Sequence, residues 1–262
     1  MKITKMKINV VKNEANSGSN EHHHHNHHHC HHHKHNEDEQ APMLQHDDFD
    51  SREFALEWAN DPLPIFFNEK LADIVVNRHL LKLGSDKISV LDFGCGAGNL
   101  TKIIKEKCNN KPKITGIDSA AAMIEVYKER FLDCDAYCLD LIKEKQDILA
   151  EKQFDYIFVF YVLHHCSDPL KMIQVLSSYV APNGTIILGE FAPEDRSKAL
   201  GEFFYGGDLT RWLNEAGFKN IVEQVAFDCE NEKLPESKLL EKTNHGNDWN
   251  PGLVIFGEGV KI

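Results

Sequence analysis

The sequence has no hydrophobic run that approaches the roughly 18 residues a helix needs to cross a bilayer, so we expect no membrane span. It is also poor in positive charge. Lys and Arg number 29 against 41 Asp and Glu, which gives a formal net charge of −12 and an isoelectric point near 5.7. Attraction to a nucleic-acid backbone comes from clustered Lys and Arg. We therefore expect a small molecule or a protein as the partner, and no nucleic acid.

Cysteine follows no regular spacing. The seven cysteines are an odd number, and several lie inside apolar runs, so we interpret them as reduced thiols. Cys134 and Cys138 are spaced as a metal-binding pair, but no second pair of ligands follows, and we expect no metal site in the folded domain. Residues 1–12 lack the apolar stretch of a secretory signal. A cytoplasmic location is expected, with the nucleus as an alternative and the mitochondrion as a weaker one, because residues 1–12 contain no acid.

The N-terminal region lacks the apolar residues needed for a core. A histidine tract spans His22–His35, interrupted by Asn26, Cys30 and Lys34. We interpret residues 1–47 as a disordered, solvated tail and residues 48–262 as one catalytic domain. Adventitious or regulatory binding of zinc, copper or nickel by the tract is the alternative for the tail.

One stretch, Ile88–Asn99 (ISVLDFGCGAGN), organises the remaining sequence. Its apolar run ends at Asp92 and is followed by three closely spaced glycines, Gly94, Gly96 and Gly98. Glycine lets the backbone turn sharply and lets a ligand approach closely. Apolar residues at helical spacing come next, so the glycines lie between a strand and a helix N-terminus. This arrangement predicts a nucleotide site, although a glycine turn without a ligand is the alternative.

Strands and helices alternate after this turn. Such alternation indicates right-handed βαβ crossovers, a parallel sheet and helices on both faces. We predict an α/β fold with a doubly wound, Rossmann-like sheet of seven strands, mostly parallel with an antiparallel last strand. The expected helices are 99–109, 119–132, 143–150, 168–181 and 207–217, and the expected strands after the first are 113–118, 135–139, 155–161, 184–190, 220–227 and 253–256.

A segment with several aromatic residues, residues 49–83, precedes the first strand and is here called the preamble. Asp61-Pro62 and Pro64 are expected to break any long helix there, and a helix is expected over residues 68–83. The preamble has no sheet position of its own. It either pads the sheet or closes over the ligand.

Three acids stand at the predicted carboxyl ends of three successive strands: Asp92, Asp118 and Asp140. Ligands of doubly wound sheets bind at these ends. A dinucleotide pyrophosphate would be repelled by Asp92, whereas S-adenosylmethionine places an ammonium and a sulfonium near Asp92, a ribose diol at Asp118 and an adenine amino group at Asp140. We therefore expect S-adenosylmethionine as the cofactor.

Several motifs support this choice. The sequence resembles the small-molecule (type 11/12) branch of the class I S-adenosylmethionine-dependent methyltransferases from about Phe49 to Gly257. The matching segments are VLDFGCGAG, ITGIDSAAAMI, FDYIFVFYVLHHCSDP, the run Val180–Gly184 and GGDLTRWLNEAGF. The resemblance implies contacts of the bound cofactor with Asp92, Gly94, Cys95, Gly96, Gly98, Asp118, Ser119, Met123, Asp140, Leu141 and Phe160.

Catalysis of methyl transfer rests largely on proximity and orientation, and only an acceptor O–H or N–H requires a base. His164 and His165 follow the fourth strand, where the acceptor would enter, and imidazole titrates near neutral pH. Tyr161 is a third candidate. Helix capping or packing is the alternative role for the two histidines.

We interpret the chain as a methyltransferase acting on a small molecule, with O- or N-transfer favoured and C-transfer open. No Asn/Asp-Pro-Pro-Tyr run follows the fourth strand, which disfavours adenine N6 and protein amides as acceptors. Methylation of a protein is the second hypothesis. An NAD-dependent oxidoreductase, and a non-catalytic protein that binds metal through its histidine tract, are alternatives from other classes.

Overall fold

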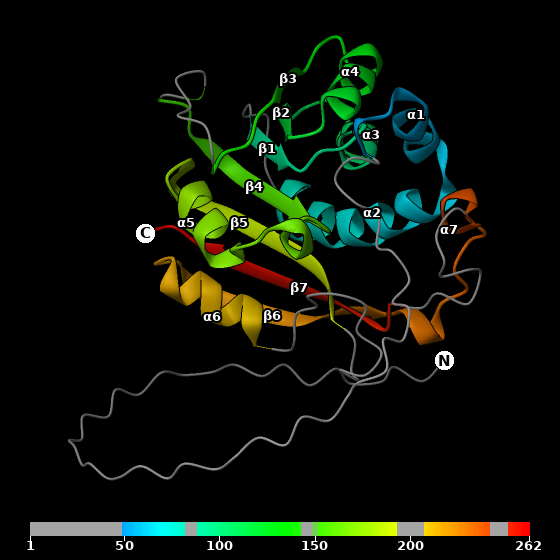
Figure 1. Cartoon of the computed structure of the whole chain (residues 1–262). Helices are drawn as coiled ribbons and strands as arrows, with labels where there is room; N and C mark the ends of the chain where they lie inside the picture. The colour runs from blue at the N-terminus through cyan, green and yellow to red at the C-terminus, as the bar shows by residue number, and fades with distance from the viewer. Residues whose placement is uncertain (1–48, 82–87, 143–148, 150, 193–206, 242–250) are drawn as a thin grey trace, which may run out of the picture. The chain divides into compact units, whose positions relative to one another are not determined.

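A seven-stranded sheet forms the centre of the computed structural model, which describes residues 49–81, 88–142, 149, 151–192, 207–241 and 251–262 (Figure 1). The strand order is β3-β2-β1-β4-β5-β7-β6. Strands β1 to β5 pair in parallel, and β7 is antiparallel to both of its neighbours, β5 and β6. The strands are β1 Ser89–Phe93, β2 Lys113–Asp118, β3 Asp135–Cys138, β4 Phe154–Phe160, β5 Val180–Ala192, β6 Lys219–Asp228 and β7 Leu253–Val260. The predicted fold class, including the antiparallel last strand, is confirmed.

Helices cover both faces of the sheet because its central strands are apolar on both sides. In β4, Ile157 and Val159 pack in one core cluster with α5 (Pro169–Ser177) and α6 (Asp208–Glu215), whereas Phe158 and Phe160 pack in a second cluster with α2 (Pro62–Val75) and α3 (Asn99–Lys107). This division follows the two-residue period of a strand. The helices are α1 Arg52–Asn60, α2 Pro62–Val75, α3 Asn99–Lys107, α4 Ala121–Arg130, α5 Pro169–Ser177, α6 Asp208–Glu215 and α7 Lys238–Glu241.

The preamble differs from the sequence-based expectation. A break does occur at Asp61, but α2 begins at Pro62 and continues through Pro64. A helix tolerates proline in its first turn, because the N–H groups there have no intrahelical acceptor. A π-helical turn, Val76–Leu80, extends α2.

The expected boundary between residues 168–181 and the fifth strand was also wrong. Helix α5 ends at Ser177, and β5 already begins at Val180, which pairs with Phe154 ahead of an irregularity in the β4–β5 ladder. Pairing with β4 therefore overrides the helical pattern of the last residues. The tail predicted over residues 1–47 lies outside the described residues. So does the helix expected over 143–150, except for residue 149, which is not α-helical.

Within the described residues, no helix combines the length and apolar character that a bilayer crossing requires.

Glycine is required at Gly217 by its backbone conformation alone, and at Gly94 also by a close contact with a side chain. Both have positive φ, +70° and +88°, but a Cβ at Gly94 would lie 2.1 Å from Val162 Cγ2, whereas one at Gly217 would meet nothing within 4 Å. We expect Gly217→Ala to lower the free energy of unfolding by about 1–2 kcal/mol through backbone strain, and Gly94→Ala by about 1–3 kcal/mol more through overpacking. Urea unfolding measures both. Equal losses would contradict the close approach of Val162.

Candidate functional site

The glycine turn after β1 lies against the end of β2. The N–H groups of Gly94 and Cys95 both donate to the carbonyl oxygen of Ile117, at 2.7 and 3.0 Å. The N–H of Gly98 donates to the carbonyl of Cys95 at 2.9 Å, and α3 begins at the next residue. The predicted strand, glycine turn and helix are therefore present, with the turn held by β2.

Asp118, at the carboxyl end of β2, joins this turn to α4. Its Oδ2 accepts a hydrogen bond from the N–H of Gly96 at 2.8 Å, and its Oδ1 accepts one from the N–H of Ala120 at 2.9 Å. The side chain is partly exposed. A carboxylate thus stands between the glycine turn and a helix start, where the sequence places a ribose diol.

Met123 lies beside the glycine turn, and Asp140 follows the strand that pairs with the end of β2. Met123 is buried, and its Sδ is 3.9 Å from the position that a Cβ at Gly96 would occupy. Asp140 follows β3, which pairs with β2 at Asp118, and its Oδ1 accepts from the N–H of Ile142 at 3.0 Å. The structure therefore brings Asp118, Met123 and Asp140 to the edge of the sheet that carries the glycine turn.

Three other predicted cofactor residues have different surroundings. Ser119 is exposed, and its carbonyl oxygen accepts from the Cys138 thiol at 3.5 Å. Leu141 and Phe160 are 5% and 7% exposed and lie in core clusters, Phe160 with its ring 5.8 Å from that of Phe158. Their cofactor contacts remain predictions.

Asp92 is directed toward the helices beneath the turn. It is buried, and its Oδ2 accepts from the Thr101 hydroxyl at 2.7 Å; that hydroxyl is also 3.0 Å from the Tyr127 hydroxyl. Burial raises the pKa of Asp92 to about 7, the hydrogen bond from Thr101 opposes this rise, and the negative charge of Asp118 adds to it. The acid that the sequence assigns to the cofactor ammonium thus also links β1, α3 and α4.

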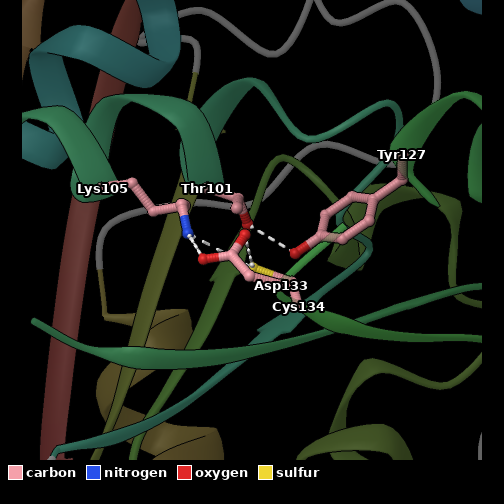
Figure 2. A network of polar contacts seen from close by, with 5 residues as sticks. All are labelled: Thr101, Lys105, Tyr127, Asp133 and Cys134. Carbon is pink, nitrogen blue, oxygen red and sulfur yellow. Dashed lines mark hydrogen bonds and ion pairs between the residues drawn. The ribbon is translucent and has the colours of Figure 1, made fainter. Parts of the chain in front are cut away.

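Figure 2 shows the polar network that continues from Thr101. One turn along α3, Lys105 pairs with Asp133 at 2.5 Å and lies 3.8 Å from the sulfur of Cys134. Burial raises the pKa of the Tyr127 phenol above its ordinary value. Helix α3 is therefore joined to α4 through Tyr127 and to the segment after α4 through Asp133 and Cys134.

Helix α1 covers the turn from the outside. The Trp58 Nε1 is 3.5 Å from the Cβ position of Gly96, and the Trp58 carbonyl accepts from Asn99 Nδ2 at 3.0 Å. The ring of Phe49 contacts those of Trp58 and His165 at centroid distances of 5.7 and 5.6 Å. Of the two roles open for the preamble, these contacts favour closure over the site.

His164 is paired with an acid that the sequence analysis did not single out. Its Nδ1 lies 2.8 Å from Oε2 of Glu190, which is fully buried near the end of β5. The other oxygen, Oε1, accepts from the N–H groups of Val162 and Leu163 at 2.8 and 2.6 Å. The acid was missed because the strand ends were compared only through the fourth strand; the fifth has Glu190.

The other two candidate bases are placed differently. Tyr161, at φ +59°, donates its hydroxyl to the carbonyl oxygen of Phe67 at 3.2 Å, and burial raises the pKa of its phenol. His165 is exposed, with its ring 4.1 Å from that of His164. Of the three, His164 has the geometry of a base oriented by a carboxylate.

No group of three or more metal-ligating side chains occurs in the part of the chain that the structure describes. The His22–His35 tract lies outside that part.

Comparison with known proteins agrees with this architecture. Residues 91–186 match the family model described as a methyltransferase domain. The ubiquinone biosynthesis O-methyltransferase of Histophilus somni is 33% identical over 109 residues, 39% of this chain and 44% of that protein. The mitochondrial ubiquinone biosynthesis O-methyltransferase of Dictyostelium discoideum is 27% identical over 146 residues, 52% of this chain and 43% of that protein. The chain thus spans about half the length of the curated relatives it matches.

Solved structures show the same fold. The magnesium protoporphyrin IX methyltransferase of Synechocystis, with bound S-adenosylmethionine, superposes with a TM-score of 0.57 at 17% identity, covering 82% of this chain and 94% of that one. The N-methyltransferase NodS of Bradyrhizobium japonicum, in complex with S-adenosylhomocysteine, gives a TM-score of 0.53 at 16% identity, covering 78% and 90%. These likenesses confirm the fold, and the match of residues 91–186 to the methyltransferase-domain model agrees with the resemblance to class I S-adenosylmethionine-dependent methyltransferases.

The buried Asp92 predicts a pH-dependent stability. Because its folded pKa is raised to about 7, the folded protein retains a proton that the unfolded chain has lost between about pH 4 and pH 7. Stability from this group is therefore lost as the pH rises through that range, by up to about 4 kcal/mol. Urea unfolding at pH 5 and pH 8 should show more than half of this fall in wild type and none of it in Asp92→Asn.

Thr101→Val provides a second test of the raised pKa of Asp92. It removes the hydrogen bond that lowers the pKa of Asp92, so the fall in stability should extend to higher pH than in wild type. Parallel pH profiles for wild type and Asp92→Asn would contradict the shifted pKa.

Proposed function

We propose that this chain is an S-adenosylmethionine-dependent O-methyltransferase that acts on a hydroxyl group of a small molecule, with His164 as the general base. The observation that carries the proposal is the pairing of His164 with the buried Glu190 at the carboxyl edge of the sheet. This pair stands beside the cofactor turn, since the Val162 side chain touches Gly94.

The residues around the turn fit an aminoacyl sulfonium nucleoside. A carboxylate offers about four acceptor positions, so Asp118 has the chemistry to serve both the backbone N–H groups and a ribose diol. Asp140 provides a second carboxylate on the neighbouring strand for an adenine amino group, and Met123 and Trp58 provide apolar surface. When bound, S-adenosylmethionine supplies a methyl group already activated by its sulfonium.

His164 is arranged to remove the acceptor proton. Glu190 fixes the ring through Nδ1, which leaves Nε2 as the basic nitrogen. A proton taken from the hydroxyl rests on Nε2, and the imidazolium is stabilised by the Glu190 charge. The deprotonated oxygen would then accept the methyl group that bound S-adenosylmethionine supplies, with S-adenosylhomocysteine as the leaving group.

The neighbours of the pair favour an apolar acceptor. The His164 ring lies 5.8 Å from the ring of Phe191, and Phe191 stacks on Tyr161 at 4.6 Å. Water-poor surroundings strengthen the interaction between the carboxylate and the imidazolium. The ubiquinone biosynthesis O-methyltransferases among the relatives support O-transfer over N- or C-transfer.

Glu190→Gln tests the base directly. The amide oxygen can still accept from Val162 and Leu163, but the amide NH₂ now faces Nδ1 of His164 and forces the ring proton onto Nε2. We expect the rate to fall by about 100-fold or more with folding preserved. The measurement is the initial rate of methyl incorporation from labelled S-adenosylmethionine into the small-molecule fraction of a cell extract.

Glu258→Gln is the matched control, because Glu258 forms an equivalent 2.8 Å pair with His79 next to Tyr156, at the start of β4. It should leave the rate unchanged. An unaffected Glu190→Gln rate would refute the base, and label in the protein fraction would favour a protein acceptor.

Asp118→Ala tests the cofactor site. Loss of a charged acceptor for the ribose is expected to weaken S-adenosylhomocysteine binding by about tenfold or more in calorimetric titration. Asp155→Ala is the control, since Asp155 likewise accepts from a backbone N–H, that of Ser89, but at the amino end of β4. NADH should produce no binding heat. Equal affinities for the two variants would show that Asp118 does not hold the cofactor.

A further inference from the structure

A third buried carboxylate, besides Asp92 and Glu190, joins the elbow between α1 and α2 to a distant segment. Asp61 is 5% exposed. Its Oδ1 accepts from the N–H of Leu63 at 2.9 Å, which caps α2, while its Oδ2 accepts from the N–H groups of Lys238 and Leu239 at 3.0 and 3.3 Å. One side chain therefore caps α2 and the start of α7, which are about 180 positions apart in sequence.

Residues 229–241, here called the strap, lie along α2. Cys229 is buried and Leu234 is partly buried in the core cluster that contains α2, and Glu232 forms a 2.8 Å ion pair with Lys70 of α2. The end of the strap, α7, lies near the start of α2 in Figure 1. Asp61 fastens that end to the elbow.

The elbow sets the direction of α1. Asp61 directly follows α1, whose last turn carries Trp58 over Gly96 of the cofactor turn. We propose that Asp61 is a positioning residue for cofactor binding: by fastening the strap to the elbow, it holds Trp58 over the glycine turn. This inference rests on the proposed function, because it concerns the same cofactor site.

Asp61→Asn separates the two caps. Asparagine caps a helix about as well as aspartate, so α2 retains its cap. The amide NH₂ that replaces Oδ2 is a donor and faces the donor groups of Lys238 and Leu239, so the hydrogen bonds that join α7 to the elbow are lost. Lys238→Pro makes the complementary change, because it removes one of the N–H donors at the first position of α7, where proline is tolerated.

Calorimetric titration of the full chain with S-adenosylhomocysteine tests the proposal. Both variants should bind about 3- to 10-fold more weakly. Asp168→Asn should bind as wild type does, since Asp168 caps only α5, through the N–H of Lys171. If Asp61→Asn does not fold, Lys238→Pro alone gives the result.

A Trp58→Leu background distinguishes positioning from general stability. If Asp61 acts through Trp58, the same variants should weaken binding less than twofold in that background, because coupled residues are not additive. Wild-type affinity in both variants, or an equal loss with and without Trp58, would overturn the proposal. Wild-type protein that does not bind S-adenosylhomocysteine would overturn the proposed function, and this inference with it.

Discussion

Backbone N–H groups that leave a strand or begin a helix have no partner in the regular structure, and here carboxylates accept their hydrogen bonds. Asp118 accepts from Gly96 in the glycine turn and from the start of α4. Glu190 accepts from two successive N–H groups in the turn after β4. Because buried N–H groups are costly without acceptors, the shape of both turns depends on these two anions.

The same two carboxylates provide polar groups at the carboxyl ends of the strands. A parallel sheet brings the carboxyl ends of its strands to one side, so Asp118 on β2 and Glu190 on β5 lie at the same edge as the glycine turn. Each carboxylate is held by backbone N–H groups, and Glu190 also contacts the imidazole of His164. Positions fixed by backbone hydrogen bonds require little reorganisation during a reaction.

Close packing of α2 on the sheet determines where α1, which covers the glycine turn at this edge, is placed. A Cβ at Gly189 in β5 would lie 2.3 Å from Leu71 Cδ1, so the packing of α2 on β5 requires glycine at this position. The elbow at Asp61 then directs α1 toward the cofactor turn, where Asn99 donates to the last turn of α1. The strap thus contacts α2 and the elbow, and α1, which ends at the elbow, contacts the glycine turn.

The sequence by itself determined the sheet, its antiparallel last strand and the grouping of Gly96, Asp118 and Asp140, because alternating hydrophobic patterns and strand-end acids are local signals. Only the tertiary structure paired His164 with Glu190 and Asp61 with Lys238. These partners are separated by 26 and 177 positions, and no local pattern specifies such pairs. The sheet register and the packing of α2 bring them together.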